Sequence, residues 1–175
     1  MRVIRLLLAG LSLAGGLLAG IAGSAAPPLA DDEISAVELA QWIAVRRTGL
    51  QLVDLRGKAE FDVDHLPGAV PLALVDAAAL PAADTTLVVY SDDSIKPDAV
   101  PKRLANRDRQ TVLRLRGGLQ AWSDEVLFPT IPSDASATRR RAFDERARLS
   151  RYFGGSPRVL EPGMNIGQPR SRRGC

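Results

Sequence analysis

Few residues of this chain have side chains that could carry out a reaction. Ser91 ends an apolar run that begins at residue 85 and precedes a polar stretch, so a hydroxyl stands where a buried strand would meet a turn. Cys175 is the only cysteine, and His65 is the only histidine. A serine nucleophile needs a neighbouring base, and His65 is the one imidazole that could serve. One histidine and one cysteine do not make the usual ligand set of a metal ion, so we predict no metal site.

The pattern of apolar residues predicts the elements that position Ser91. Residues 50–56 and 85–91 have the length and hydrophobicity of strands that are buried on both faces. Residues 34–47 predict an amphipathic helix, because Ser35 stands three residues before Glu38 as in a capping box. Residues 111–122 predict a strand, a glycine turn and the start of a helix. Strands that alternate with helices predict an α/β fold with a central parallel sheet and helices on both faces.

The first 26 residues differ from the rest in composition. Arg2 and Arg5 precede a long uncharged stretch of Leu, Ala and Gly that ends in small residues. This order is typical of a secretory signal peptide, and we expect cleavage between residues 24 and 30. The protein would then be periplasmic or secreted. The alternative is an uncleaved N-terminal membrane anchor, since about 20 apolar residues can span a bilayer.

The C-terminal part also departs from the α/β pattern. We interpret residues 127–155 as a linker and one extra helix, because Ala142, Leu149 and Phe153 have helical spacing and two glycines follow them. Residues 156–175 have no periodicity, and their Pro, Gly and Arg content predicts an irregular, flexible, basic arm that ends in Cys175.

Charge is divided unevenly along the chain. Residues 27–133 carry eleven basic and sixteen acidic residues, a net charge of −5, whereas residues 134–175 carry ten arginines and four acidic residues, a net charge of +6. A basic tail of this kind is usually solvated. Because export argues against a nucleic acid, we predict no nucleic-acid partner, and membrane contact only through an uncleaved signal segment.

Four separated motifs occur in an informative order: LVDLR at 52–56, EFDVDHLPGAV at 60–70, LVVYS at 87–91 and LRGGLQAW at 115–122. Together they resemble the rhodanese homology domain of the sulfurtransferase family, over residues 34–126. The resemblance implies a small α/β domain in which a reactive cysteine ends a central strand. Its thiolate would take a sulfane sulfur from a donor, hold it as a persulfide and pass it to a nucleophile.

Aligned with that pattern, the cysteine position falls on Ser91. The loop whose backbone N–H groups would form an anion cradle then consists of Asp92, Asp93, Ser94, Ile95 and Lys96. The resemblance also implies an internal polar network that includes Asp54 and Arg56, and a structural, turn-forming role for His65. A hydrolase built on Ser91 and His65 is therefore disfavoured.

The serine at position 91 changes the expected chemistry. A hydroxyl ionises far above the pKa of a thiol, and oxygen cannot store sulfane sulfur as a persulfide. Asp92 and Asp93 would repel a dianion such as thiosulfate, although their residue types also favour helix capping. We therefore predict an exported binding or regulatory module without ordinary thiosulfate sulfurtransferase activity. We expect no cofactor, and the ligand would be an unknown protein partner or a small sulfur compound.

Cys175 leaves two alternatives open. An arm of about 20 residues has a root-mean-square span near 25 Å, while a domain of about 100 residues has a radius of gyration near 13 Å. The arm could therefore bring Cys175 to the Ser91 loop and make the protein a sulfurtransferase or a thiol or persulfide relay. Alternatively, Cys175 could link two chains through a disulfide bond.

Overall fold

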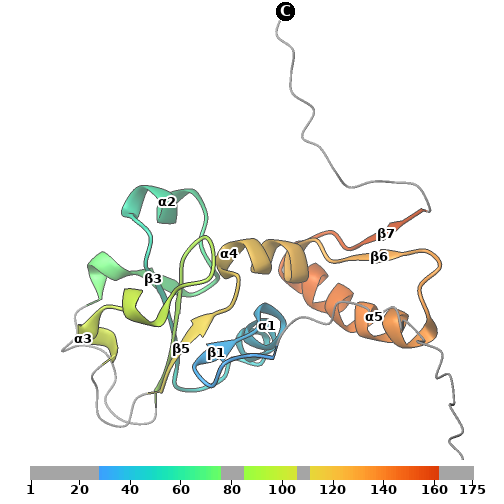
Figure 1. Ribbon diagram of the computed structural model, residues 1–175. Coiled ribbons are helices and arrows are strands. Elements are labelled where there is room, and N and C mark those ends of the chain that lie inside the picture. Colours follow the sequence, from blue (N-terminus) through green and yellow to red (C-terminus); the bar gives the residue numbers. More distant parts are fainter. Residues whose placement is uncertain (1–27, 76–84, 106–110, 162–175) are drawn as a thin grey trace, which may run out of the picture.

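A five-stranded parallel sheet forms the centre of the molecule (Figure 1). The computed structural model describes residues 28–75, 85–105 and 111–161. Within them the strand order is β1–β5–β4–β2–β3. The strands are β1 (Glu33–Ile34), β2 (Leu50–Asp54), β3 (Ala69–Pro71), β4 (Thr86–Tyr90) and β5 (Thr111–Leu115). The α/β fold class with a central parallel sheet is thus confirmed.

The helices cover both faces of this sheet. They are α1 (Ala36–Ala44), α2 (Lys58–Val63), α3 (Lys102–Ala105), α4 (Gly118–Ala121), the π-helical η3 (Trp122–Leu127) and α5 (Ala137–Tyr152), with 3-10 helices at Leu72–Leu74 and Pro97–Ala99. In Figure 1, α1 and α4 lie on one side of the sheet and α3 on the other. Among the described parts of the chain, no helix is both long enough and apolar enough to cross a membrane.

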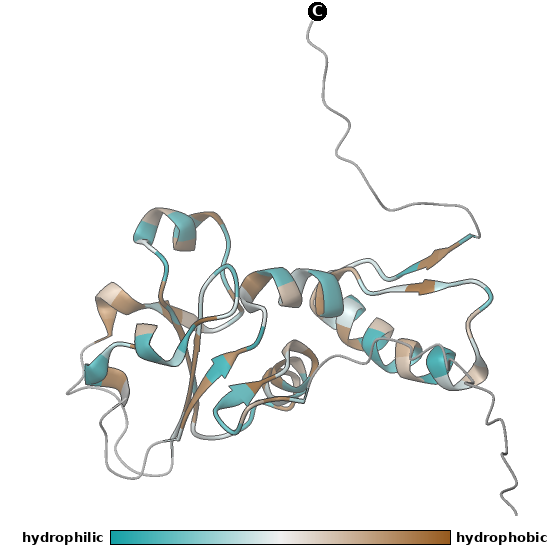
Figure 2. Ribbon diagram, viewed as in Figure 1, coloured by the Kyte–Doolittle hydropathy of each residue, from teal (hydrophilic) through white to brown (hydrophobic). Residues whose placement is uncertain are grey.

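Strand β4 is central and fully buried from Leu87 to Tyr90, which explains its continuous run of apolar residues. It pairs with β2, where Asp54 is the partner of Tyr90, and with β5, where Val89 is opposite Arg114. Side chains alternate along a strand. Leu87 and Val89 accordingly join the hydrophobic cluster on the α3 side, and Val88 joins the cluster on the α1 side. Figure 2 shows this concentration of hydrophobic residues in the central strands.

Helix α1 follows the capping signal in its sequence. Ser35 is the N-cap residue, and its Oγ accepts a hydrogen bond from the backbone N–H of Glu38 at 3.2 Å. Leu39 and Ala40 are fully buried against the sheet. The sequence prediction of this helix is confirmed.

Helix α5 is confirmed as well, and it packs onto the α/β domain. Phe153, which follows the helix, makes an edge-to-face contact with Trp122 of η3, with ring centroids 5.0 Å apart. The buried Ser150 donates a hydrogen bond from Oγ to the carbonyl of Leu127 at 2.7 Å, and the backbone N–H of Ser156 donates to the same carbonyl at 2.8 Å. The C-terminal end of α5 is therefore fixed to the end of η3.

Two short strands appear where the sequence indicated a linker and an irregular arm. β6 (Thr130–Pro132) and β7 (Arg158–Leu160) pair in parallel, with Ile131 opposite Val159. The prediction that the arm is irregular from residue 156 onward is wrong for residues 158–160. Three-residue strands are too short to produce a periodic pattern. Their pairing joins a segment that precedes α5 in the sequence to one that follows it. Residues 162–175 of the arm and residues 1–26 of the expected signal peptide lie outside the described residues.

The hydrogen bond from Ser150 Oγ to the carbonyl of Leu127 allows a test of how much it stabilises the packing of α5 on η3. We expect Ser150→Ala to lower the free energy of unfolding by about 1 kcal/mol, because one buried hydrogen bond is lost while the carbonyl keeps its bond from Ser156. Ser156→Ala is the matched control: it keeps that backbone bond, and its side chain is exposed, so we expect little change. Urea denaturation of both variants measures the difference. Equal stability of both would show that the side-chain bond contributes nothing.

Candidate functional site

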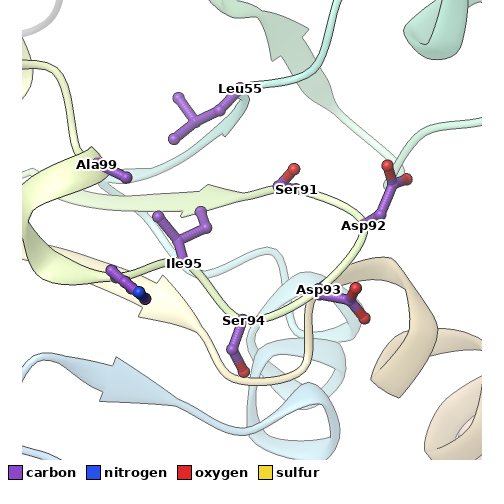
Figure 3. Close-up of a pocket in the computed structure, with 8 residues that line it drawn as sticks. Leu55, Ser91, Asp92, Asp93, Ser94, Ile95 and Ala99 are labelled. Carbon is purple, nitrogen blue, oxygen red and sulfur yellow. The ribbon is translucent and has the colours of Figure 1, made fainter.

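The loop of residues 91–96 follows β4 directly and forms most of a pocket of about 480 Å³ (Figure 3). The residues that line it are Leu55, Ser91, Asp92, Asp93, Ser94, Ile95, Lys96 and Ala99. In Figure 3, the apolar side chains of Leu55, Ile95 and Ala99 gather on one side, and the carboxylates of the two aspartates lie on the other. The pocket thus stands at the carboxyl end of the central strand, where open parallel sheets generally bind ligands.

Ser91 is half-buried in the pocket wall, and its hydroxyl makes no hydrogen bond to His65. Within the described residues its hydroxyl has no hydrogen-bond partner. His65 is engaged elsewhere, because its Nδ1 donates to the carbonyl of Phe61 at 2.9 Å and its ring stacks on the Phe61 ring with centroids 4.1 Å apart. The arrangement therefore lacks the serine–histidine contact that a hydrolase would need.

The turn that precedes α4 holds the loop from one side. The backbone N–H of Gly117 donates to Ser94 Oγ at 2.7 Å. The N–H groups of Leu119 and Gln120 donate to the carbonyls of Ser91 and Asp92 at 2.9 and 3.0 Å. The N–H groups of Gly117, Leu119 and Gln120 therefore bind the loop itself and are not available to a ligand.

Gly118 allows this close approach of the two segments. Its φ is +52°, in the left-handed region that favours glycine, and a Cβ atom at this position would lie 2.3 Å from the carbonyl oxygen of Ser91. The second glycine of the LRGGLQAW motif is therefore required by contact with the Ser91 loop as well as by the turn.

Arg114 holds the loop from the sheet. This buried residue of β5 donates from Nη1 to the carbonyl of Ile95. Its Nη2 and Nε donate to the carboxylate of Asp32 at 2.6 and 3.0 Å, and Glu33 lies 3.4 Å from Nη1. The hydrogen bond from Arg114 lowers the pKa of Asp32. The sequence analysis missed Arg114, although a cation within an apolar strand is a signal that could have indicated it.

Arg56 lies beside the pocket at the centre of a network of carboxylates. Its side chain is only 6 % exposed, and it contacts Asp54, which is fully buried, at 2.8 Å. Its Nη1 donates to Asp64 at 3.0 Å and to Asp92 at 3.1 Å. These hydrogen bonds, that of Asp54 first, raise the pKa of Arg56. The structure thus places Asp54 and Arg56 in one ion pair and connects them to the loop through Asp92.

Tyr90, the last residue of β4, extends this network into the core. Its hydroxyl accepts a hydrogen bond from the backbone N–H of Leu66 at 3.2 Å. Burial raises the pKa of Tyr90, and the neighbouring Asp54 carboxylate raises it further. The hydroxyl therefore stays protonated, and the sequence reasoning did not single it out.

The capping interpretation of the two aspartates is wrong. The loop continues into a single 3-10 turn, Pro97–Ala99, whose N-cap position is Lys96 and which has no side-chain cap. Asp92 binds Arg56 instead, and Asp93 is exposed without a hydrogen bond or ion pair to any residue that the structure describes. The physical reason is that no helix of several turns begins next to these carboxylates.

The backbone of the loop retains features of an anion cradle. Across the parts of the chain that the structure describes, no acceptor is found for the backbone N–H groups of residues 92–96. Unpaired N–H groups in a turn are what an anion-binding concavity requires. Among these same parts no group of three or more His, Cys, Asp or Glu side chains could hold a metal ion. Cys175 lies outside the described residues, so its distance from the pocket stays untested.

One family model and several known proteins are similar to this chain. The family model described as Rhodanese-like domain matches residues 35–125. A protein named probable adenylyltransferase/sulfurtransferase MoeZ, from two strains of Mycobacterium tuberculosis, is 28 % identical over 112 residues, which cover 61 % of this chain and 28 % of that protein. The chain thus spans less than a third of the length of these curated relatives.

Two solved structures are also similar to the chain. A rhodanese-like domain from Anabaena sp. is 21 % identical, with a TM-score of 0.46, over 54 % of this chain and 74 % of that one. A protein from Bacillus halodurans is 20 % identical, with a TM-score of 0.42, over 51 % of this chain and 69 % of that one.

The contact between Gly118 and the Ser91 loop can be tested by a matched pair of substitutions. We expect Gly118→Ala to lower the free energy of unfolding by roughly 2–4 kcal/mol, because the new Cβ meets backbone atoms as well as an unfavourable φ. Gly68 also has a positive φ, +79°, but a Cβ there meets nothing within 4 Å. Gly68→Ala should therefore cost only about 1 kcal/mol. Thermal or urea unfolding compares the two, and equal losses would contradict a steric role of Gly118.

The Asp32–Arg114 pair predicts a dependence of stability on pH. Because the pKa of Asp32 is lowered in the folded protein, the pair stabilises the fold above the unfolded pKa of about 3.9. This contribution is lost as the pH falls through the folded pKa. We expect Asp32→Asn to be less stable than the wild type at pH 6, and the difference to shrink towards pH 3. Urea midpoints measured across this range check the prediction, and a difference that does not change with pH would contradict it.

Proposed function

The chain belongs to the rhodanese-like domain family, and from this we propose that it is an exported member that binds a ligand or a partner in the pocket of residues 91–96. In this proposal it does not perform ordinary thiosulfate sulfur transfer. The bound species is a small sulfur compound or a segment of a partner protein, and binding has a regulatory role.

The observation that carries the proposal is the position of Ser91. It follows the central strand and lines the pocket, at the place that the family resemblance assigns to the reactive cysteine. In sulfur transfer the cysteine thiolate attacks the sulfane sulfur, the donor leaves with the bonding electron pair, and a persulfide remains. A serine hydroxyl has neither the acidity nor the sulfur chemistry for this step.

The loop around Ser91 is nevertheless well ordered by contacts. Ser91 and Asp92 accept hydrogen bonds from backbone N–H groups of α4, and Ile95 accepts one from Arg114. A pocket that is held in place on two sides and is lined by both apolar and charged side chains can bind a ligand without reacting with it. This retention of the loop supports a binding role over simple loss of the site.

Export is part of the proposal and rests on residues 1–26 alone. Their basic start, apolar middle and small-residue end favour a cleaved signal peptide and a periplasmic or secreted protein. The alternative of an uncleaved membrane anchor is kept, because the apolar stretch is of the length that spans a bilayer.

Relay chemistry through Cys175 is the competing function. Cys175 is the only thiol of the chain, so a persulfide on the wild-type protein would identify it directly. A disulfide-linked dimer through the same residue would appear as a band of twice the monomer mass in non-reducing electrophoresis.

The decisive test introduces a cysteine at position 91. We expect Ser91→Cys, combined with Cys175→Ser, to gain one sulfur atom from cysteine persulfide, because the loop keeps the place of the family nucleophile. In this reaction the thiolate introduced at position 91 takes the terminal sulfur, and free cysteine leaves as its thiolate. Intact-mass spectrometry before and after reduction detects the gain.

Two controls decide between the functions. Wild-type protein and Cys175→Ser alone should each transfer no sulfur to a thiol acceptor. Transfer by the wild type that is abolished by Cys175→Ser would replace the proposed function by the relay. Failure of Ser91→Cys to gain sulfur while the protein is folded would show that the pocket is not a preserved family site.

A further inference from the structure

We propose that Asp92 is a built-in anion that excludes small dianionic ligands from the pocket of residues 91–96. Its carboxylate lines the pocket, accepts a hydrogen bond from Arg56 beside the pocket and adds a negative charge. This inference rests on the proposed function, because it concerns the same pocket, and it deepens that function by naming the class of ligand that is rejected. The wild-type pocket accordingly selects neutral or cationic ligands over sulfur oxyanions such as thiosulfate.

All the N–H donors of the Arg56 side chain are engaged by other residues of the protein. An arginine has five N–H donors. Nε donates to Asp54 at 3.1 Å, Nη2 donates to the other oxygen of Asp54 at 2.8 Å and to the carbonyl of Asp64, and Nη1 donates to Asp64 at 3.0 Å and to Asp92 at 3.1 Å. The guanidinium is therefore saturated, and none of its donors is left for a ligand.

Asp92 differs from the other partners of Arg56 in its position. It is the only one of them that lines the pocket, and its side chain is 71 % exposed. Asp54, in contrast, is fully buried and also accepts a hydrogen bond from the backbone N–H of Arg56 at 2.9 Å. Loss of the Asp92 side-chain acceptor would therefore free one Nη1 donor of Arg56 beside the pocket while Asp54 and Asp64 keep the guanidinium in place.

The charges of the residues that line the pocket also oppose the binding of a dianion. The lining residues Asp92 and Asp93 outnumber Lys96, so the lining has a net charge of −1. A dianion entering this pocket meets like-charge repulsion and finds the nearest buried cation already paired. Removing the Asp92 side-chain acceptor makes the lining neutral and adds a charge-assisted donor for the ligand.

Asp93 provides a matched control within the same loop. It has the same side chain and also lines the pocket, but it makes no ion pair or hydrogen bond to any residue in the described ranges. Asp93→Ala therefore changes the net charge of the pocket by the same amount as Asp92→Ala. It does not release a donor of Arg56.

The experiment measures binding of thiosulfate to the full chain with Ser91 present, in the Cys175→Ser background so that no thiol can react. Amide chemical shifts of residues 91–96 in an NMR titration at fixed ionic strength report the dissociation constant. We expect thiosulfate to bind Asp92→Ala about tenfold more tightly than the parent, because the acceptor of Arg56 Nη1 is removed, one charge-assisted hydrogen bond to the ligand is gained and one repulsion is lost. For Asp93→Ala we expect about twofold, since only the repulsion is removed.

The outcomes separate the alternatives. Equal gains for the two variants would show that net charge alone decides, and would overturn the role assigned to the Arg56 contact. Absence of a gain for Asp92→Ala would overturn it too. Asp92→Asn removes the charge but keeps an amide oxygen that can accept from Arg56 Nη1, so it should gain only about twofold. Melting curves of all variants verify that they fold.

The thiosulfate titration is independent of the persulfide experiment that tests the proposed function. The titration needs no cysteine at position 91, whereas the persulfide test uses Ser91→Cys with Asp92 present and a donor that is not a dianion. A failed persulfide test with a successful titration would refute the preserved nucleophile position and leave the role of Asp92 standing. The opposite combination would leave the pocket as a family site and refute the role of Asp92.

Discussion

The conformation of the Ser91 loop depends on hydrogen bonds that its own carbonyl groups accept from neighbouring elements. Ser91 and Asp92 accept from backbone N–H groups of α4, and Ile95 accepts from the buried Arg114 of β5. These three carbonyls are engaged by the protein, whereas the N–H groups of residues 92–96 have no acceptor in the described chain. The same constraint explains Gly118, since a side chain there would separate α4 from the loop.

This division of backbone groups makes the loop a potential anion site, and its side chains oppose that tendency. The N–H groups would favour a negative ligand. The carboxylate of Asp92 is placed beside them and is held there by Arg56. The proposed binding role depends on this combination and on the serine at the position that the family resemblance assigns to the nucleophile.

The C-terminal helix belongs to the same body as the sheet. Leu127 accepts hydrogen bonds from Ser150 and Ser156, and Phe153 packs on Trp122 beside the main hydrophobic core. The basic residues of α5 are thereby carried on a fixed helix, whereas the sequence alone suggested a helix joined through a linker. The acidic pocket and the basic helix are consequently separate surfaces of one domain.

The sequence by itself determined the α/β class, the buried strands β2 and β4, the capped helix α1, helix α5 and the location of Ser91 at the end of a strand. Each of these depends on local signals: apolar runs, helical spacing, a capping serine and motifs of neighbouring residues. Only the tertiary structure decided that Asp92 binds Arg56, that Arg114 holds Ile95, and that β6 pairs with β7. These contacts join residues between 19 and 36 positions apart, where the chain direction, and not a local pattern, sets which groups meet.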